Sequence, residues 1–263
     1  MYYLFTDETN QQPSEKSEFF IYGGAFVSAN ILSESHSLVG DVRVRYGFQP
    51  GDEFKFSPHT KPAHVEREDF RLAKREVLQG CYQLGVTFSA YLTLHRIAHN
   101  KSMDELVSWG ANSIIANFDY FLEENGDIGI CIVDRLPIGN DFGYLRDRFQ
   151  HGLQFPDGRK KGLPRILMFA ASCEGASHAM SAIDILIGSF RYCVNEREKD
   201  IAPREILRVI ARMMWYREVG GVRYLRERGL LLRPKNVKVQ EFQAAYDDLV
   251  KHLQVLSSEK AED

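Results

Sequence analysis

The stretch YYLFTDET, residues 2–9, places two acids directly at the end of an apolar and aromatic run. A short run rich in β-forming residues predicts a strand that is buried on both faces. Acidic residues are unfavourable in such a strand, because an unpaired buried charge is costly. The position of Asp7 and Glu8 at the end of this run therefore needs an explanation.

The whole chain is long and apolar enough to bury a full core. It has 263 residues, of which 44% are hydrophobic and 12% aromatic, and this length fits one large domain or a domain with an appendage. The chain begins directly with the strand, and no window approaches the roughly 18 consecutive apolar residues of a membrane span. Its four cysteines form no CxxC pair and are typical of reduced core thiols. We expect a soluble, cytoplasmic protein without a membrane partner.

Strands and helices alternate along the sequence. We expect strands over residues 2–7, 18–27, 85–94, 128–133 and 165–170, the first two forming an antiparallel pair. We expect helices over residues 30–46, 63–80 and 102–125, one that starts near residue 177, and two or three more within 203–257. Ser102 and Glu105 have capping-box spacing at the start of the third helix. The pattern predicts an α/β core over residues 1–200, with a mixed central sheet flanked by helices, and a helical C-terminal extension over residues 201–263 that packs on it.

A second strand also ends in an acid, because the run IGICIV leads straight into Asp134. If the strands that end in Asp7 and Asp134 are parallel neighbours, their carboxylates lie close together at one edge of the sheet. Two such carboxylates repel one another unless a cation intervenes. Hard divalent metals such as Mg²⁺ prefer oxygen ligands of this kind. Rigid strands that hold metal ligands would explain why the two acids are there.

The helix that starts near Ser177 carries a third acid. An apolar stripe of Met180, Ile183, Ile187, Phe190 and Val194 has helical spacing and predicts the face that packs on the sheet. The adjoining face consists of Ser177, Ser181, Asp184, Gly188 and Arg191. Small residues around Asp184 would allow another backbone or a ligand to approach closely.

Four segments together resemble, in order and approximate spacing, a family of bacterial and phage proteins known as domain of unknown function 3800. These segments are YLFTDET, DEFKF, ICIVD and SCEGASHAMSAIDILIGSFR, and they span residues 2 to about 195. The resemblance implies a ribonuclease H-like fold and four metal-ligating acids, Asp7, Glu53, Asp134 and Asp184. It implies that Glu8 and Lys55 support the ligands or face a phosphate. The chain departs from the family pattern at Ser181, where Gln is usual, and at Thr9, where Ser is usual.

Each of these acids also has a plain structural interpretation. Asp7 and Glu8 could begin a solvated turn, Asp134 could pair with Arg135, and Glu53 could be an exposed loop acid. Asp184 is harder to explain in this way, because it borders an apolar helix face where an unpaired charge is costly.

Other catalytic patterns fail. His95 and His99 are four residues apart, but no glutamate is placed as in HExxH and no third ligand is evident. The segment GASHA does not give a GxSxG nucleophile elbow, and YGGAF lacks the GK[ST] of a phosphate loop.

Basic residues are concentrated late in the chain. Residues 204–238 contain ten Lys or Arg against three Glu, and Arg204, Arg208 and Arg212 would line one helical face. This face could contact the phosphate backbone of nucleic acid, or it could be solvated or paired within the protein. Residues 157–165 form a second basic segment.

The sequence therefore predicts a nuclease that hydrolyses phosphodiester bonds with two divalent cations, Mg²⁺ or Mn²⁺. One metal would activate water, and the other would stabilise the leaving oxygen and the charge on phosphorus. Asp7, Glu53, Asp134 and Asp184 would hold the metals, and Lys55 could assist at phosphate. The alternative is an inactive nuclease-like scaffold that binds nucleic acid or a protein partner.

Overall fold

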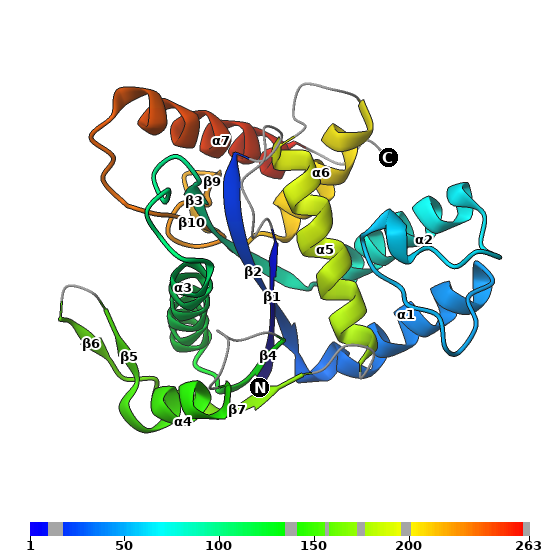
Figure 1. Ribbon diagram of the computed structural model, residues 1–263, viewed down its shortest axis with the longest axis horizontal. Coiled ribbons are helices and arrows are strands. Elements are labelled where there is room, and N and C mark those ends of the chain that lie inside the picture. The colour runs from blue at the N-terminus through cyan, green and yellow to red at the C-terminus, as the bar shows by residue number, and fades with distance from the viewer. Residues whose placement is uncertain (10–17, 135–140, 156–157, 173–176, 196–200, 260–263) are drawn as a thin grey trace.

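The computed structural model describes residues 1–9, 18–134, 141–155, 158–172, 177–195 and 201–259. Its centre is a six-stranded sheet in the order β10-β3-β2-β1-β4-β7 (Figure 1). The strands are β1 (Tyr2–Thr9), β2 (Phe19–Ser28), β3 (Thr87–Leu94), β4 (Gly129–Val133), β7 (Ile166–Ala171) and β10 (Leu230–Leu232). Strand β2 pairs antiparallel with both β1 and β3, whereas β4 is parallel to β1 and to β7. The predicted mixed sheet is confirmed.

Helices cover both faces of the sheet, so that β1 is buried on each side. The helices are α1 (Leu32–Arg45), α2 (Arg67–Gln83), α3 (Met103–Glu124), α4 (Asp141–His151), α5 (His178–Asn195), α6 (Ile201–Met213) and α7 (Gln240–Ser258). Figure 1 shows α3 and α5 on opposite sides of the central strands. Successive side chains of a strand point to opposite faces. Accordingly, Phe5 packs in the cluster on the α5 face and Leu4 in the cluster on the α3 face.

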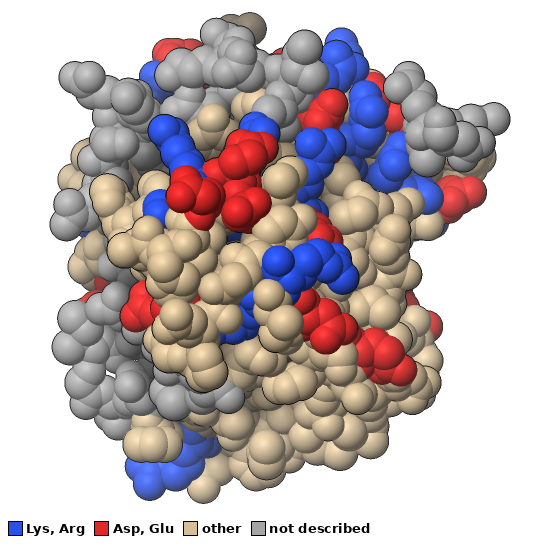
Figure 2. Space-filling model, turned by 90° about the vertical axis from the view of Figure 1, so that its right-hand side faces the viewer, with Lys and Arg blue, Asp and Glu red and all other residues tan. Residues whose placement is uncertain are grey.

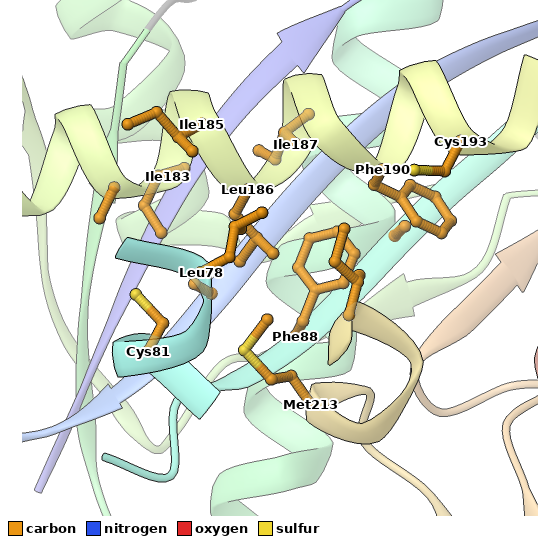
Figure 3. Close-up of a cluster of buried hydrophobic side chains, with 14 of the residues drawn as sticks. Leu78, Cys81, Phe88, Ile183, Ile185, Leu186, Ile187, Phe190, Cys193 and Met213 are labelled. Atoms are coloured by element: carbon orange, nitrogen blue, oxygen red, sulfur yellow. The ribbon is translucent and has the colours of Figure 1, made fainter. Parts of the chain in front are cut away.

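The larger core lies between the sheet and α5. Figure 3 shows Phe190 of α5 near Phe88 of β3, with Ile183 and Leu186 above Leu78 of α2 and Met213 of α6 in the same cluster. Helix α5 comes very close to β2, since a Cβ placed at Gly23 would lie 2.6 Å from a side-chain carbon of Ile187. The apolar stripe predicted for this helix is therefore its packing face.

The capping box expected at the start of α3 is present. The Ser102 hydroxyl accepts a hydrogen bond from the Glu105 N–H at 3.2 Å, and the Glu105 carboxylate accepts one from the Ser102 N–H at 3.0 Å. These two bonds satisfy backbone donors that a helix start otherwise leaves without a partner.

The C-terminal part of the chain differs from the helical extension expected for residues 201–263. Helices α6 and α7 are there, but β10 joins the central sheet parallel to β3, and β8 (Arg217–Val219) and β9 (Val222–Tyr224) form a small ribbon. Leu207 and Tyr246 belong to the same core cluster as α5. The segment thus completes the sheet and the core, although the expected boundary at residue 200 falls outside the described residues. A three-residue strand is too short to show the alternation from which strands are predicted.

A second two-stranded ribbon, β5 (Leu153–Gln154) with β6 (Lys160–Lys161), lies away from the central sheet. Among the helices described, none combines the length and the hydropathy that crossing a membrane requires.

Candidate functional site

Asp7 and Asp134 lie at the same edge of the sheet on neighbouring parallel strands. In the β1–β4 register Thr6 is opposite Val133, and the backbone N–H of Asp134 donates to the carbonyl oxygen of Thr6 at 3.3 Å. Strand alternation places Asp7 on the same face as Phe5, the face that α5 covers. The expected juxtaposition of the two acids is confirmed.

Asp184 is brought to these acids by α5, which packs on β1. Its charge, together with those of Glu8 and Asp134, acts on Asp7. The Oδ2 atom of Asp184 also accepts a hydrogen bond from the backbone N–H of Phe56 at 2.6 Å. Three acids from widely separated parts of the sequence therefore converge on one face of the sheet.

The electrostatic state of Asp7 reflects this convergence. Burial raises the pKa of the Asp7 carboxyl well above its usual range, and the charges of Glu8, Asp184 and Asp134 raise it further. The Glu8 N–H donates to Asp7 Oδ1 at 2.8 Å and acts in the opposite direction. Like charges near a buried carboxylate favour its protonated form unless a cation compensates.

Asp184 has a different environment, because cations accompany it. Burial raises the pKa of Asp184, whereas the Phe56 N–H and the charges of Lys55, Lys74 and Arg191 lower it. The site thus combines an acidic part around Asp7 with a basic part around Asp184. Positive charge beside a carboxylate cluster suits a substrate that carries phosphate.

The loop segment around Phe56 fixes Asp184 by several contacts. Besides the N–H that bonds Asp184, the Phe56 carbonyl accepts a hydrogen bond from Lys74 Nζ at 3.0 Å. The Phe56 ring packs so closely on α5 that a Cβ at Gly188 would lie 2.5 Å from the Cβ of Phe56. Small residues near Asp184 were expected to admit a backbone or a ligand, and Gly188 admits Phe56.

Lys74 was not identified from the sequence. Its Nζ lies 4.8 Å from the ring centroid of Phe56 and 4.5 Å from that of Phe70, in cation–π geometry. Burial lowers the pKa of Lys74 to about 8, opposed by the charge of Asp184. Lys74 is one of several charged residues on α2, so the sequence of the helix does not single it out. Its contacts with the loop residue Phe56 distinguish it from the others.

The remaining predicted site residues differ in how they relate to the cluster. Lys55 is half-buried and its charge acts on Asp184, as expected of a residue that supports the site. Glu8 is half-buried and its charge acts on Asp7. Glu53 is exposed, and the charges that act most strongly on Asp7 and Asp184 belong to other residues. A role of Glu53 as a metal ligand stays a prediction.

The donor chemistry of the cluster fits a hard divalent cation, because all of its donors are carboxylate oxygens. The positions of its side chains do not form a complete metal site. Within the described ranges, no three His, Cys, Asp or Glu side chains lie together as a group that could hold a metal ion. The acids share one electrostatic environment without forming a ligand shell as they stand.

Arg204, Arg208 and Arg212 line one face of α6, as the sequence predicts, and all three contact Glu259. The Arg204 and Arg208 guanidinium groups lie 3.1 and 2.7 Å from its carboxylate oxygens, and Arg212 donates to its backbone carbonyl at 2.6 Å. Pairing within the protein was one of the alternatives to phosphate binding at this face. These contacts show such pairing, and binding of the three arginines to phosphate stays a prediction.

Charges of both signs are mixed on the face of the molecule that Figure 2 shows. Figure 2 shows Lys and Arg lying beside Asp and Glu on the side of the molecule that is on the right in Figure 1. In the basic segment 157–165, Lys161 pairs with buried Asp119 at 2.5 Å and lies 3.9 Å from the ring centroid of Tyr120. Lys161 therefore packs against the body of the protein.

Fold and site together define a mixed α/β protein in which carboxylates gather at the ends of parallel strands beneath a crossing helix. In comparisons with known proteins, no protein-family model matches the chain, and no curated protein matches it. The resemblance to domain of unknown function 3800 stays a prediction from the sequence.

Proposed function

We propose that the protein is a divalent-metal-dependent phosphodiesterase acting on nucleic acid, built on a ribonuclease H-like fold. The observation that carries the proposal is the arrangement of Asp7 and Asp134 at the ends of neighbouring parallel strands, with Asp184 of α5 beside them. In agreement with it, burial and the charges of Glu8, Asp184 and Asp134 raise the pKa of Asp7. A bound cation would neutralise this accumulation of negative charge. The mixed sheet flanked by helices agrees with the proposed fold.

Asp7, Asp134 and Asp184 are the residues that would hold Mg²⁺ or Mn²⁺. When bound, the metal would supply activation of water and stabilisation of charge at phosphorus. The protein itself orients these ligands: the β1–β4 register fixes Asp7 beside Asp134, and the Phe56 N–H fixes one oxygen of Asp184. Lys55 and Arg191, whose charges act on Asp184, supply the positive side of the site, where a substrate phosphate would be attracted.

The experiment separates metal binding from cleavage. Mn²⁺ is titrated calorimetrically into the wild type, Asp7→Asn, Asp184→Asn and the control Asp247→Asn, which removes an exposed carboxylate that pairs with Arg226. The same proteins are incubated with labelled single-stranded and double-stranded DNA and RNA in Mn²⁺ or in EDTA. Asp7→Asn and Asp184→Asn should lose both Mn²⁺ binding and Mn²⁺-dependent cleavage, whereas the control keeps both. Cleavage that survives in both site variants would overturn the proposal.

A second candidate function is a nuclease-like scaffold that binds without cleaving. It is favoured by the exposed position of Glu53 and by the lack of a complete metal-holding group among the residues that the structure describes. This function would be supported if the protein binds nucleic acid in EDTA but does not cleave it in Mg²⁺ or Mn²⁺. The calorimetric titration with Mn²⁺ should then show no heat of binding.

We further propose a cytoplasmic location. Cys81, Cys131 and Cys193 are free, buried thiols, which agrees with a reducing compartment, and Cys173 lies outside the described residues.

A further inference from the structure

Four arginines contact the end of α7, three from α6 and Arg223 from β9, and they make two different kinds of contact. Helices α6 and α7 pack side by side, in the upper part of Figure 1. Arg212 donates to the Glu259 carbonyl at 2.6 Å and Arg223 to the Ser257 carbonyl at 2.9 Å. The last carbonyls of a helix have no partner within the helix, and cations there are stabilising. These two contacts dock the helix end through its backbone.

Arg204 and Arg208 contact the side chain of Glu259, not its backbone. Arg204 Nη2 lies 3.1 Å from Oε1, and Arg208 Nε lies 2.7 Å from Oε2. Two guanidinium groups therefore share one carboxylate, and the group keeps an excess of positive charge. The Arg204 side chain is 59% exposed, whereas those of Arg208 and Glu259 are 28% and 25% exposed. Exposed ion pairs contribute little to stability, so the contact of Arg204 is the weaker of the two. The two backbone contacts of α7 do not involve the Glu259 carboxylate.

The chemistry of the position suits phosphate. Guanidinium groups bind carboxylate and phosphate oxygens with the same planar fork of donors, so a carboxylate held between two arginines occupies a place that a phosphate can take. Arg204, Arg208 and Arg212 follow at steps of four residues, about 6 Å along the helix. A row of charges at such steps suits a chain of phosphates better than one isolated ion.

We propose that Arg204 and Arg208 form a binding position for the phosphate backbone of nucleic acid, which the Glu259 carboxylate occupies until nucleic acid displaces it. The proposal deepens the proposed nucleic-acid function and rests on it for the class of ligand. The Glu259 carboxylate would then lower non-productive binding without blocking the site permanently.

The first test compares two variants that each remove one negative charge near α6. Glu259→Gln releases Arg204 and Arg208, whereas the control Glu205→Gln, on the same helix, releases Arg75, which Glu205 contacts at 2.9 Å. Binding of a fluorescent single-stranded DNA, the matching RNA and the DNA duplex is measured by anisotropy in EDTA. Glu259→Gln should bind roughly fivefold more tightly than the wild type, the factor expected from removing a competing exposed ion pair. Glu205→Gln should bind like the wild type. Equal affinity of the two variants would overturn the proposal.

The second test removes the arginines from the released site. Arg204→Gln and Arg208→Gln, added to Glu259→Gln, should abolish the gain in affinity. The slope of log affinity against log salt should flatten by about 0.7 to 0.9 for each phosphate that the protein no longer neutralises. An unchanged slope would show that these arginines only dock α7. Thermal unfolding of each variant verifies that the fold is retained, as expected because the two backbone contacts remain.

Two further experiments test whether the position binds a single phosphate or a chain of phosphates, and whether its binding depends on the acid cluster. Inorganic phosphate that displaces the DNA more effectively than chloride of equal ionic strength would indicate a site for a single anion and would overturn the polyanion proposal. Combining Asp7→Asn with Glu259→Gln should keep the gain in binding in EDTA. A gain that persists in a protein without any cleavage activity would support this binding position while rejecting the proposed phosphodiesterase.

Discussion

The backbone N–H of Phe56 and the carboxylate of Asp184 are joined by a 2.6 Å hydrogen bond, although 128 residues separate them in sequence. A loop between α1 and α2 thereby fixes an acid on α5. The carbonyl oxygen of Phe56 also accepts a hydrogen bond from Lys74, and the Phe56 side chain packs on Gly188. Phe56 therefore connects three elements, and this connection leads to the first two predictions.

Gly188→Ala should lower the free energy of unfolding by about 1 to 2 kcal/mol, because overpacking against Phe56 exceeds the gain in helix propensity. Adding Phe56→Ala removes the ring atoms Cγ and Cδ1, two of the three atoms closest to the new methyl group, so the two substitutions should couple favourably in a double-mutant cycle measured by urea denaturation. Gly162→Ala is the control, since nothing lies within 4 Å of a Cβ there. Strictly additive effects of Gly188→Ala and Phe56→Ala would contradict the close contact.

Lys74 should make stability depend on alkaline pH. Its pKa is about 8 in the folded protein and 10.5 as its ordinary value, so between these values the unfolded chain binds more protons than the folded one. Stability contributed by this group therefore rises as pH increases from 8 to 10.5. Urea denaturation across this range should show a smaller rise for Lys74→Met than for the wild type. Lys101→Met, which replaces an exposed lysine, is the control. An identical pH dependence of all three proteins would refute the assignment.

Asp7→Asn should stabilise the protein at pH 7 in EDTA. The folded-state pKa of Asp7 lies above its ordinary value of 3.8, so the folded state binds more protons between the two values and stability falls as pH rises through this window. Asparagine keeps an oxygen that can accept the Glu8 N–H, and it carries no charge. In urea denaturation, Asp7→Asn should lose less stability between pH 4 and pH 7 than the wild type does. Destabilisation at pH 7 would mean that Asp7 is a structural partner.

Ser102→Ala should lower the free energy of unfolding by about 0.5 to 2 kcal/mol, because it removes the hydroxyl that caps α3. Ser108→Ala, within the same helix, serves as the comparison and should change stability by less. Thermal denaturation monitored by circular dichroism measures both. Equal stabilities of the two variants would show that the capping box contributes nothing in the folded protein.

The positions of Asp7 and Asp134 could be predicted from the sequence, because both follow short apolar runs whose β-forming residues specify strands locally. The stripe on α5 and the capping box of α3 were also predictable, since each depends on a spacing within one element. Local patterns of this kind also led to Asp184, an acid beside an apolar helix face.

Contacts between distant elements were not predictable in the same way. Glu53 lies in a loop among charged neighbours, and only the folded chain leaves it exposed while bringing the backbone of Phe56 to Asp184. Lys74 acquires its shifted pKa from burial under a loop and two rings that pack on it. Strand β10 is too short to show a pattern and is defined by its hydrogen bonds to β3.

The sequence by itself determined strands β1–β4 and β7, the main helices and the acids that end β1 and β4, because these features depend on side-chain periodicity within a single segment. Only the tertiary structure decided which charges meet: Asp184 with Phe56 and the nearby cations, and Arg204 and Arg208 with Glu259. The physical reason is that burial and the distances between charges set electrostatic interactions, and both arise when segments far apart in sequence pack together.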